Sequence, residues 1–342
     1  MNITICGGGN LGHVCAGFLS AQSDNKVSLL TTKPEEWSKE LDVIDCKRNF
    51  FHGVLDRISR HPDEVIPGAE MVLICLPGFA IGNELRVIAP YLHPSCLVGS
   101  VVSSTGFFFE AFKTLLKSQP LFGFQRVPFI SRIIKYGKEA ELKGYKNLLY
   151  VAIEQTNGKE VIKSKLENLF RTPMKLLDSH FEASLSNSNP LLHTSRLYTL
   201  WHDWKPGMSF DRNPDFYAEW TIEASELYIN MDMEFQQILK GLGLRDGCIP
   251  SVLDYYESND AESLTMKISS IPAFQGISSP MFINEFGKYE PDLTSRYFTE
   301  DFPYGLKFIV DTANKQGINI PYINTVYNWG MSICQDNNLS KQ

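Results

Sequence analysis

Two polar segments in the second half of the chain combine side chains suited to proton transfer. The first reads SNSNPLLH over residues 186–193, and the second reads SRYFTEDFP over residues 295–303. Histidine exchanges protons near neutral pH, a carboxylate can orient it, and arginine can hold a carboxylate through two parallel hydrogen bonds. These residue types together suit acid–base chemistry on a substrate that carries an acid group.

The spacing within the first segment places two of its polar side chains together. Asn189 and His193 share one helix face if Pro190 opens a helix at its first turn. By itself, however, the pattern favours a structural role for His193. It is equally compatible with a solvated loop around Arg296, Glu300 and Asp301, because charged runs usually face water.

The N-terminus carries a glycine-rich turn between a short strand, residues 2–6, and a helical run. A turn of the form G-x-G-x-x-G in this context is the dinucleotide-binding fingerprint. The first glycine permits the tight turn, the second lets the backbone approach a pyrophosphate, and the third packs the helix on the strand. Without this context a glycine-rich turn is weak support for a nucleotide site. The residues expected to contact the cofactor here are Gly7, Gly9, Asn10, Leu11 and Gly12.

The end of the second predicted strand, residues 27–30, distinguishes between the two nicotinamide cofactors. NAD-binding folds usually place Asp or Glu there to bind the ribose 2′-hydroxyl. This chain has Thr31, Thr32 and Lys33 instead, and its next acid is Glu35. Two hydroxyls and an ammonium group suit a 2′-phosphate, so the sequence favours NADP(H) over NAD(H). A solvated Lys33 on a loop is the alternative.

The rest of the first half predicts a doubly wound α/β sheet. The unbroken apolar run at residues 71–75 is typical of a strand buried on both faces. The loop that follows it lies at a carboxyl strand end, where such sheets bind ligands, so we expect Leu76 and Pro77 to contact the cofactor. Further strands are expected at 97–102, 121–124, 147–153 and 174–177, with helices at 80–92, 107–116 and 161–170. This Rossmann-type domain is predicted to span residues 1–180.

The second half predicts an all-α domain over residues 181–342. Residues 216–242 place apolar side chains at steps of three and four, which indicates one stripe of a long helix ending near Gly241 and Gly243. Two further helices are expected at 306–314 and 322–334. Two domains agree with the chain length of 342 residues, and we expect the site in the cleft between them.

Composition narrows the class of protein. The net charge is −7, which argues against a nucleic-acid partner, and no apolar run approaches the roughly 18 residues of a membrane span. Seven cysteines without a C-x-x-C pair, and a start without a signal peptide, indicate reduced thiols and a cytoplasmic location. The histidines and cysteines show no ligand spacing, so no metal site is expected.

The whole chain resembles the opine dehydrogenase family, which includes octopine and nopaline dehydrogenases. The resemblance rests on the N-terminal glycine fingerprint and on the Asn-Pro-x-x-His stretch that ends at His193. It also rests on Tyr217 followed by Asp232-x-Glu234, and on the Arg-Tyr-x-x-Glu-Asp-x-Pro pattern at residues 296–303.

The resemblance implies a function and a set of site residues. It implies that His193 is the catalytic acid/base, paired with Asp301, and that Arg296 and Asn189 bind substrate. The implied reaction is NADP(H)-dependent reduction of the imine formed from a 2-oxo acid and an amino acid. Its small-molecule substrates would bind a monomer or homodimer whose helical domain is similar to that of 6-phosphogluconate dehydrogenase. Thr194 departs from the proline that many relatives carry after the histidine.

Two other functions fit the same fold. A ketopantoate-type 2-oxo acid reductase, or another carbonyl reductase, would need no amine. Such families generally use a lysine of the helical domain, but Lys205, Lys240 and Lys267 lie in no recognisable motif. A protein that binds NADP(H) without turnover is the third interpretation, and it gives no reason for an acid/base pair.

Overall fold

The computed structural model describes residues 1–339 of the chain, with side chains to residue 334. The chain folds into two compact units, Met1–Ser186 and Asn187–Gln342. The predicted domain boundary after residue 180 falls at the first residue of α6 (His180–Leu185). That helix packs against strand β11 (Leu149–Glu154) of the first unit.

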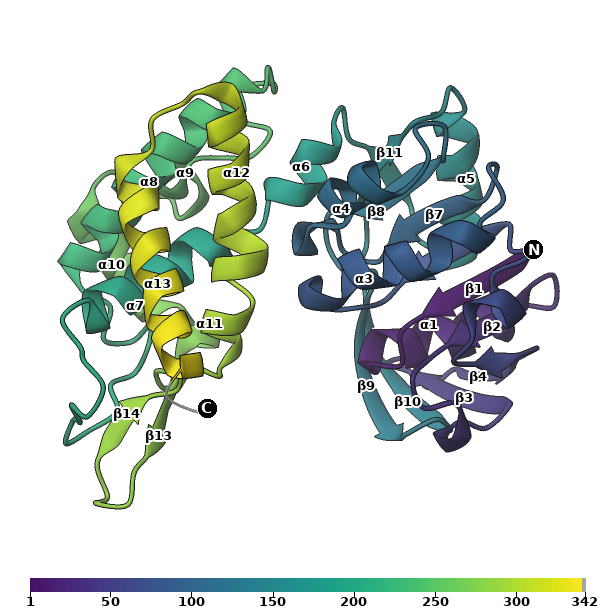
Figure 1. Ribbon diagram of the computed structural model, residues 1–342, viewed down its shortest axis with the longest axis horizontal. Coiled ribbons are helices and arrows are strands. Elements are labelled where there is room, and N and C mark those ends of the chain that lie inside the picture. Colours follow the sequence, from purple (N-terminus) through teal and green to yellow (C-terminus); the bar gives the residue numbers. More distant parts are fainter. Residues whose placement is uncertain (340–342) are drawn as a thin grey trace. The chain divides into compact units, whose positions relative to one another are not determined.

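The first unit is built on one eight-stranded sheet with the strand order β12-β11-β8-β7-β6-β1-β2-β5. Its strands pair in parallel except for β8 and β11, which are antiparallel. Strands β6, β7 and β8 are buried at every residue, as expected for a sheet covered on both faces. The prediction of a Rossmann-type fold is therefore confirmed (Figure 1). The remaining bounds are β1 (Asn2–Cys6), β2 (Lys26–Leu30), β5 (Ile58–Ser59), β6 (Met71–Ile74), β7 (Leu97–Ser100), β8 (Leu121–Phe124) and β12 (Met174–Leu176).

Helices cover both faces of this sheet because its strands present apolar side chains to both sides. Leu73 of β6 lies in a core shared with α1 and α5, whereas Val72 and Ile74 lie in a second core shared with α3 and α4. The helices of this unit besides α6 are α1 (Asn10–Ser20), α2 (Pro62–Val65), α3 (Gly78–Ile88), α4 (Phe107–Thr114) and α5 (Lys159–Phe170).

A second, four-stranded sheet was not predicted from the sequence. Its order is β4-β3-β10-β9, and all four strands contact helix α1. Three of the strands carry charged residues among their apolar ones, so their sequences look like surface loops rather than buried strands. This sheet places a backbone layer beside the helix that follows the glycine-rich turn. Its strands are β3 (Glu40–Asp45), β4 (Phe50–Val54), β9 (Phe129–Lys135) and β10 (Glu139–Tyr145).

The second unit is helical, as predicted, with the exception of one short hairpin, β13 (Met281–Ile283) and β14 (Tyr289–Pro291) (Figure 1). Helix α8 begins at Ile222 rather than at residue 216, because the Thr221 hydroxyl caps it by accepting a hydrogen bond from the Ala224 N–H. No helix of the described chain is long and apolar enough to cross a membrane. The helices are α7 (Asn189–Trp201), α8 (Ile222–Gly241), α9 (Val252–Tyr255), α10 (Ala261–Ser270), α11 (Arg296–Thr299), α12 (Lys307–Gln316) and α13 (Pro321–Leu339).

Candidate active site

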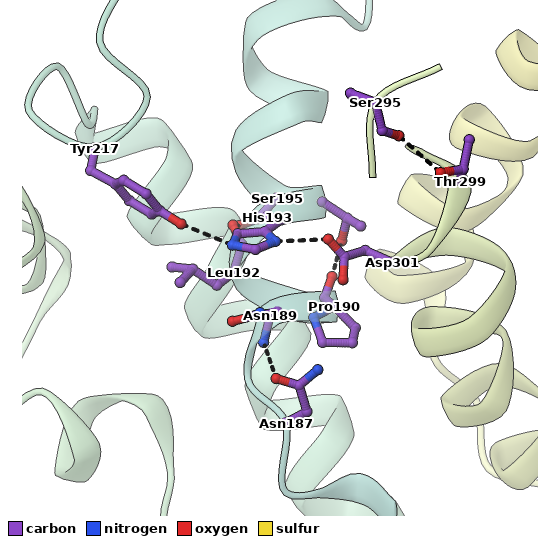
Figure 2. Close-up of polar contacts among 11 residues, drawn as sticks. Asn187, Asn189, Pro190, Leu192, His193, Ser195, Tyr217, Ser295, Thr299 and Asp301 are labelled. Carbon is purple, nitrogen blue, oxygen red and sulfur yellow. Dashed lines mark hydrogen bonds and ion pairs between the residues drawn. The ribbon is translucent and has the colours of Figure 1, made fainter. Parts of the chain in front are cut away.

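A histidine and an aspartate lie in direct contact in the helical unit. The Nδ1 atom of His193 is 2.7 Å from the Oδ2 atom of Asp301, although the two residues are 108 positions apart (Figure 2). His193 projects from α7, which opens with Pro190 in its first turn as predicted, and Asp301 precedes the π-helical turn Phe302–Leu306 that packs against α7. Their side chains are 12% and 15% exposed, so the pair is largely shielded from water and still reachable.

The aspartate determines which imidazole nitrogen is available for proton exchange. A carboxylate accepts hydrogen bonds, so the Nδ1 atom carries the proton that is donated to Asp301. The Nε2 atom of His193 lies 2.8 Å from the hydroxyl oxygen of Tyr217 (Figure 2). The ring of Tyr297 packs beside the imidazole, with its centroid 4.6 Å away. The pair therefore presents one oriented Nε2 atom for acid–base work.

The two predicted substrate-binding residues are exposed, and their side chains are available to bind a ligand. Asn189 is the first residue of α7, and its backbone N–H donates to the Asn187 side chain at 3.3 Å while its own carboxamide is left for other partners (Figure 2). Arg296 begins α11, and within the described chain its guanidinium makes no ion pair or hydrogen bond. Thr194, the departure from the family pattern, stays inside α7 and donates its hydroxyl to the Pro190 carbonyl. Helix α7 thus continues through residues 193 and 194 with threonine in place of the proline.

Two acids on α8 cap neighbouring helices. Asp232 accepts a hydrogen bond from the Val252 N–H at 2.9 Å, at the start of α9. Glu234 accepts from the N–H groups of Tyr322 and Ile323 at 2.8 and 2.9 Å, at the start of α13. Burial raises the pKa of both carboxyl groups, while these amide donors oppose that rise. The contacts give both acids a structural role.

The glycine-rich turn in the first unit has the shape that a dinucleotide requires. A Cβ atom at Gly12 would lie 2.1 Å from the Gly7 carbonyl oxygen, so only glycine allows α1 to pack this closely on the turn. In contrast, nothing lies within 4 Å of a Cβ atom at Gly9, so that position faces open space. Gly9 also precedes α1, whose first amides have no side-chain cap. The turn therefore offers free amides at a helix N-terminus, which is a suitable place for a pyrophosphate.

Replacing Gly9 by alanine tests whether this open space is where the cofactor binds. We expect Gly9→Ala to fold normally, because its φ of −82° suits alanine, and to weaken NADPH and NADH binding by at least about tenfold. Calorimetric titration would measure the binding, and thermal unfolding would report the fold. Gly158→Ala, which alters the glycine capping α5 and meets only an ordinary contact, is the matched control. Unchanged affinity in Gly9→Ala would contradict this placement.

The second sheet is tied to the glycine-rich turn by two side chains. Buried His13 donates from Nδ1 to the Gly9 carbonyl at 3.0 Å, and its Nε2 atom accepts from the Gly137 N–H at 2.8 Å. Burial lowers the pKa of His13, which agrees with this neutral form. The Asn10 side-chain oxygen accepts from the Ile133 N–H at 2.8 Å, so the backbone N–H and the side-chain amide nitrogen of Asn10 are left for a cofactor.

A cavity of about 350 Å³ adjoins the glycine-rich turn and brings together part of the predicted cofactor set. It is lined by Gly7, Thr31, Thr32, Lys33 and Leu76 of that set. Gly9, Asn10, Leu11, Gly12 and Pro77 are not among its lining residues. Several other residues that line the cavity were not predicted from the sequence, including Arg60, Glu84 and Tyr136.

Two cations at this cavity form only exposed ion pairs. The Lys33 ammonium lies 3.1 Å from a Glu36 carboxylate oxygen, and the Arg60 guanidinium lies 2.6 Å from one of Glu35. All four side chains are about half exposed, and ion pairs in such positions contribute little stability. A bound phosphate could therefore displace the carboxylates. Arg60 follows β5, which pairs with β2 in the sheet, so no local sequence pattern could have associated it with Lys33.

Within the described chain, no group of three or more His, Cys, Asp or Glu side chains is placed to hold a metal ion.

A Rossmann-type unit with a dinucleotide turn, followed by a helical unit with a His–Asp pair, defines a nicotinamide-nucleotide-dependent dehydrogenase. Comparison with known proteins specifies the family. Residues 176–334 match the family model described as NAD/NADP octopine/nopaline dehydrogenase, alpha-helical domain. Over these residues the chain is similar to the opine dehydrogenase family, and it is a dehydrogenase that acts on CH–NH donors.

Individual relatives match along nearly the whole chain. Tauropine dehydrogenase of Arabella iricolor is 27% identical, over 97% of this chain and 91% of its own length. Opine dehydrogenase of Haliotis discus hannai is 25% identical, over 96% and 89%. A solved structure of octopine dehydrogenase with NADH and L-arginine superposes with a TM-score of 0.86 and 24% identity, over 97% of this chain and 89% of that one.

Proposed function

We propose that this protein is an NADP(H)-dependent opine dehydrogenase that reduces the imine formed between a 2-oxo acid and an amino acid. The observation that carries the proposal is the contact between His193 and Asp301. This pair lies in the part of the chain that matches the family's helical domain. The overall reaction consumes a 2-oxo acid, an amino acid, NADPH and one proton, and it yields a secondary amine, NADP⁺ and water.

The chain's own residues handle the proton and the substrate carboxylate. When bound, the cofactor supplies the hydride. His193 donates the proton consumed in the reductive direction and recovers it in the reverse direction, while Asp301 holds the imidazole tautomer and stabilises its cationic form. Arg296 binds the carboxylate of the oxo acid through its planar fork, and the Asn189 carboxamide hydrogen-bonds the substrate.

The preference for NADP(H) rests on the cations at the cavity beside the glycine-rich turn. Lys33 and Arg60, with the hydroxyls of Thr31 and Thr32, supply charge-assisted hydrogen bonds to a 2′-phosphate. Each such bond to a charged group contributes about 1.5–3 kcal/mol, which corresponds to roughly 10- to 150-fold in affinity.

Removing one of these cations tests the cofactor preference. We expect Arg60→Ala to lower kcat/KM for NADPH by about tenfold or more and to leave kcat/KM for NADH nearly unchanged. Steady-state rates with both cofactors would measure this. Arg57→Ala removes another exposed arginine, three residues earlier and outside this cavity, and is the control. A clear preference of the unmodified protein for NADH would refute the assignment.

The substrate class is tested by requiring both substrates. NADPH oxidation would be followed with a matrix of 2-oxo acids and amino acids, each supplied alone and in pairs. We expect turnover only with a pair, and a secondary-amine product by mass spectrometry. Oxidation with a 2-oxo acid alone would instead indicate a simple carbonyl reductase of the ketopantoate type. Cofactor binding without turnover on any pair would refute the proposal.

A further inference from the structure

Tyr217 occupies the one imidazole nitrogen that His193 has available for proton exchange. Its hydroxyl oxygen lies 2.8 Å from Nε2, opposite the contact between Nδ1 and Asp301 (Figure 2). A substrate proton that reaches or leaves His193 must therefore either displace Tyr217 or pass through it.

The packing of Tyr217 favours passage over displacement. The residue is 5% exposed, and its ring stacks on Phe274 with the centroids 4.1 Å apart. The preceding residue, Phe216, anchors the segment by donating its backbone N–H to the Ile277 carbonyl at 2.7 Å. The stacked ring and its anchored neighbour keep the hydroxyl in place, while the hydroxyl hydrogen remains free to rotate.

A second tyrosine extends the contact. The hydroxyl groups of Tyr217 and Tyr297 lie close enough for each to shift the pKa of the other, and the Tyr297 ring packs beside the His193 imidazole with the centroids 4.6 Å apart. Tyr297 is only half-buried, whereas Tyr217 is buried, so Tyr297 lies at the outer end of the chain of contacts. With neutral His193, Tyr217 donates to Nε2 and accepts from Tyr297. With cationic His193, the Nε2–H donates to Tyr217, whose own hydrogen then points to Tyr297.

We propose that Tyr217 is a positioning residue that relays the exchanged proton between Nε2 of His193 and the hydroxyl of Tyr297. In the reductive direction, the Nε2–H bond breaks and a new O–H bond forms on Tyr217. The former hydroxyl proton of Tyr217 moves at the same time to the Tyr297 oxygen, which releases its own proton outward to the oxygen atom of the 2-oxo acid that leaves as water when the imine forms. One proton enters and one leaves each hydroxyl, so only His193 changes charge.

The environment of Tyr217 agrees with a relay by neutral hydroxyls. Burial is the main cause that raises the pKa of Tyr217 well above that of an ordinary tyrosine, so the ring is kept protonated. Burial also raises the pKa of Tyr297. A phenolate intermediate, in which Tyr217 has given up its proton before receiving another, is thereby disfavoured, whereas concerted passage needs no charged tyrosine.

The test compares Tyr217→Phe and Tyr297→Phe with the unmodified enzyme. Tyr228→Phe, which removes the hydroxyl of another buried tyrosine of the helical unit, is the control. We expect Tyr217→Phe to lower kcat by about tenfold or more, part of the 10²–10⁴-fold effect typical of proton transfer, with an unchanged Kd for NADPH. Tyr228→Phe should stay within about twofold, as expected for a residue outside the proton path.

A proton inventory separates a relay from a merely structural role. Single-turnover rates would be measured across mixtures of H₂O and D₂O. We expect a curved dependence in the unmodified enzyme, because several protons move together, and a straight one in Tyr217→Phe. No solvent isotope effect in the unmodified enzyme, or the same curvature in Tyr217→Phe, would overturn the relay. If Tyr217→Phe does not fold, Tyr297→Phe provides the test. An unchanged rate and an unchanged curvature of the proton inventory in Tyr297→Phe would also overturn the relay.

This inference rests on the proposed acid–base role of His193. Different experimental results would refute the relay and the proposed function. If His193→Gln stays fully active, both the proposed function and the relay are wrong. If His193→Gln is inactive while Tyr217→Phe keeps the original rate and curvature, only the relay is wrong.

Discussion

His193→Gln is expected to lower kcat by about 10²–10⁴-fold, the range typical of a lost general acid–base group. Glutamine nearly fills the space of the imidazole and can still hydrogen-bond Asp301 and Tyr217, but it cannot carry the exchanged proton. Because the glycine-rich turn is expected to hold the pyrophosphate and is not altered, the Kd for NADPH should not change. Single-turnover kinetics and calorimetric titration would measure the two quantities.

The chain contains a matched control for this substitution. His52 also places its Nδ1 atom 2.7 Å from an aspartate, Asp42, but on the exposed second sheet of the first unit. We expect His52→Gln to leave kcat within about twofold, because a surface ion pair contributes little even to stability. A loss of less than about tenfold in His193→Gln would contradict an acid–base role for His193.

Local sequence patterns predicted those parts of the fold whose structure depends on near neighbours. The fingerprint at residues 7–12 and the apolar run at residues 71–75 correspond to β1, α1 and β6. The second sheet escaped prediction because the charged residues of its strands obscure the apolar alternation, and because β3 and β10, which join its two hairpins, lie far apart in the sequence. Pairing partners far apart in the chain leave little signal in a single sequence.

In the candidate site, too, local sequence patterns predicted some contacts, whereas contacts between distant segments could not be predicted. Spacing could place Asn189 and His193 on one helix, but the pairing of His193 with Asp301 came from the family resemblance. Arg60 reaches the predicted cofactor residues only through strand pairing, and the contact of Tyr217 with His193 depends on where α8 begins. The expected helix start at residue 216 would have placed Tyr217 inside α8. Because the Thr221 cap starts α8 only at Ile222, Tyr217 lies in the segment before the helix.

Asp301→Asn is the second substitution with a large expected effect, and it isolates the role of the negative charge. Asparagine keeps the shape of the side chain, but its amide can donate to Nδ1 as well as accept from it. It can therefore stabilise the wrong imidazole tautomer, with the proton on Nε2 and the lone pair facing residue 301. It also removes the charge that stabilises the cationic form of His193. In another His–Asp pair the same change lowers kcat by about 10⁴-fold.

We expect Asp301→Asn to lower kcat by about 10²–10⁴-fold without unfolding the helical unit, because the amide retains one hydrogen bond at this largely shielded position. Single-turnover rates and thermal unfolding of the same preparation would measure both effects. Asp42→Asn makes the identical change at the exposed His52 pair and should leave both quantities unchanged. A near-normal rate in Asp301→Asn, combined with inactivity of His193→Gln, would mean that His193 works without an oriented tautomer. The 2.7 Å contact would then be structural, and the acid–base function would belong to the imidazole alone.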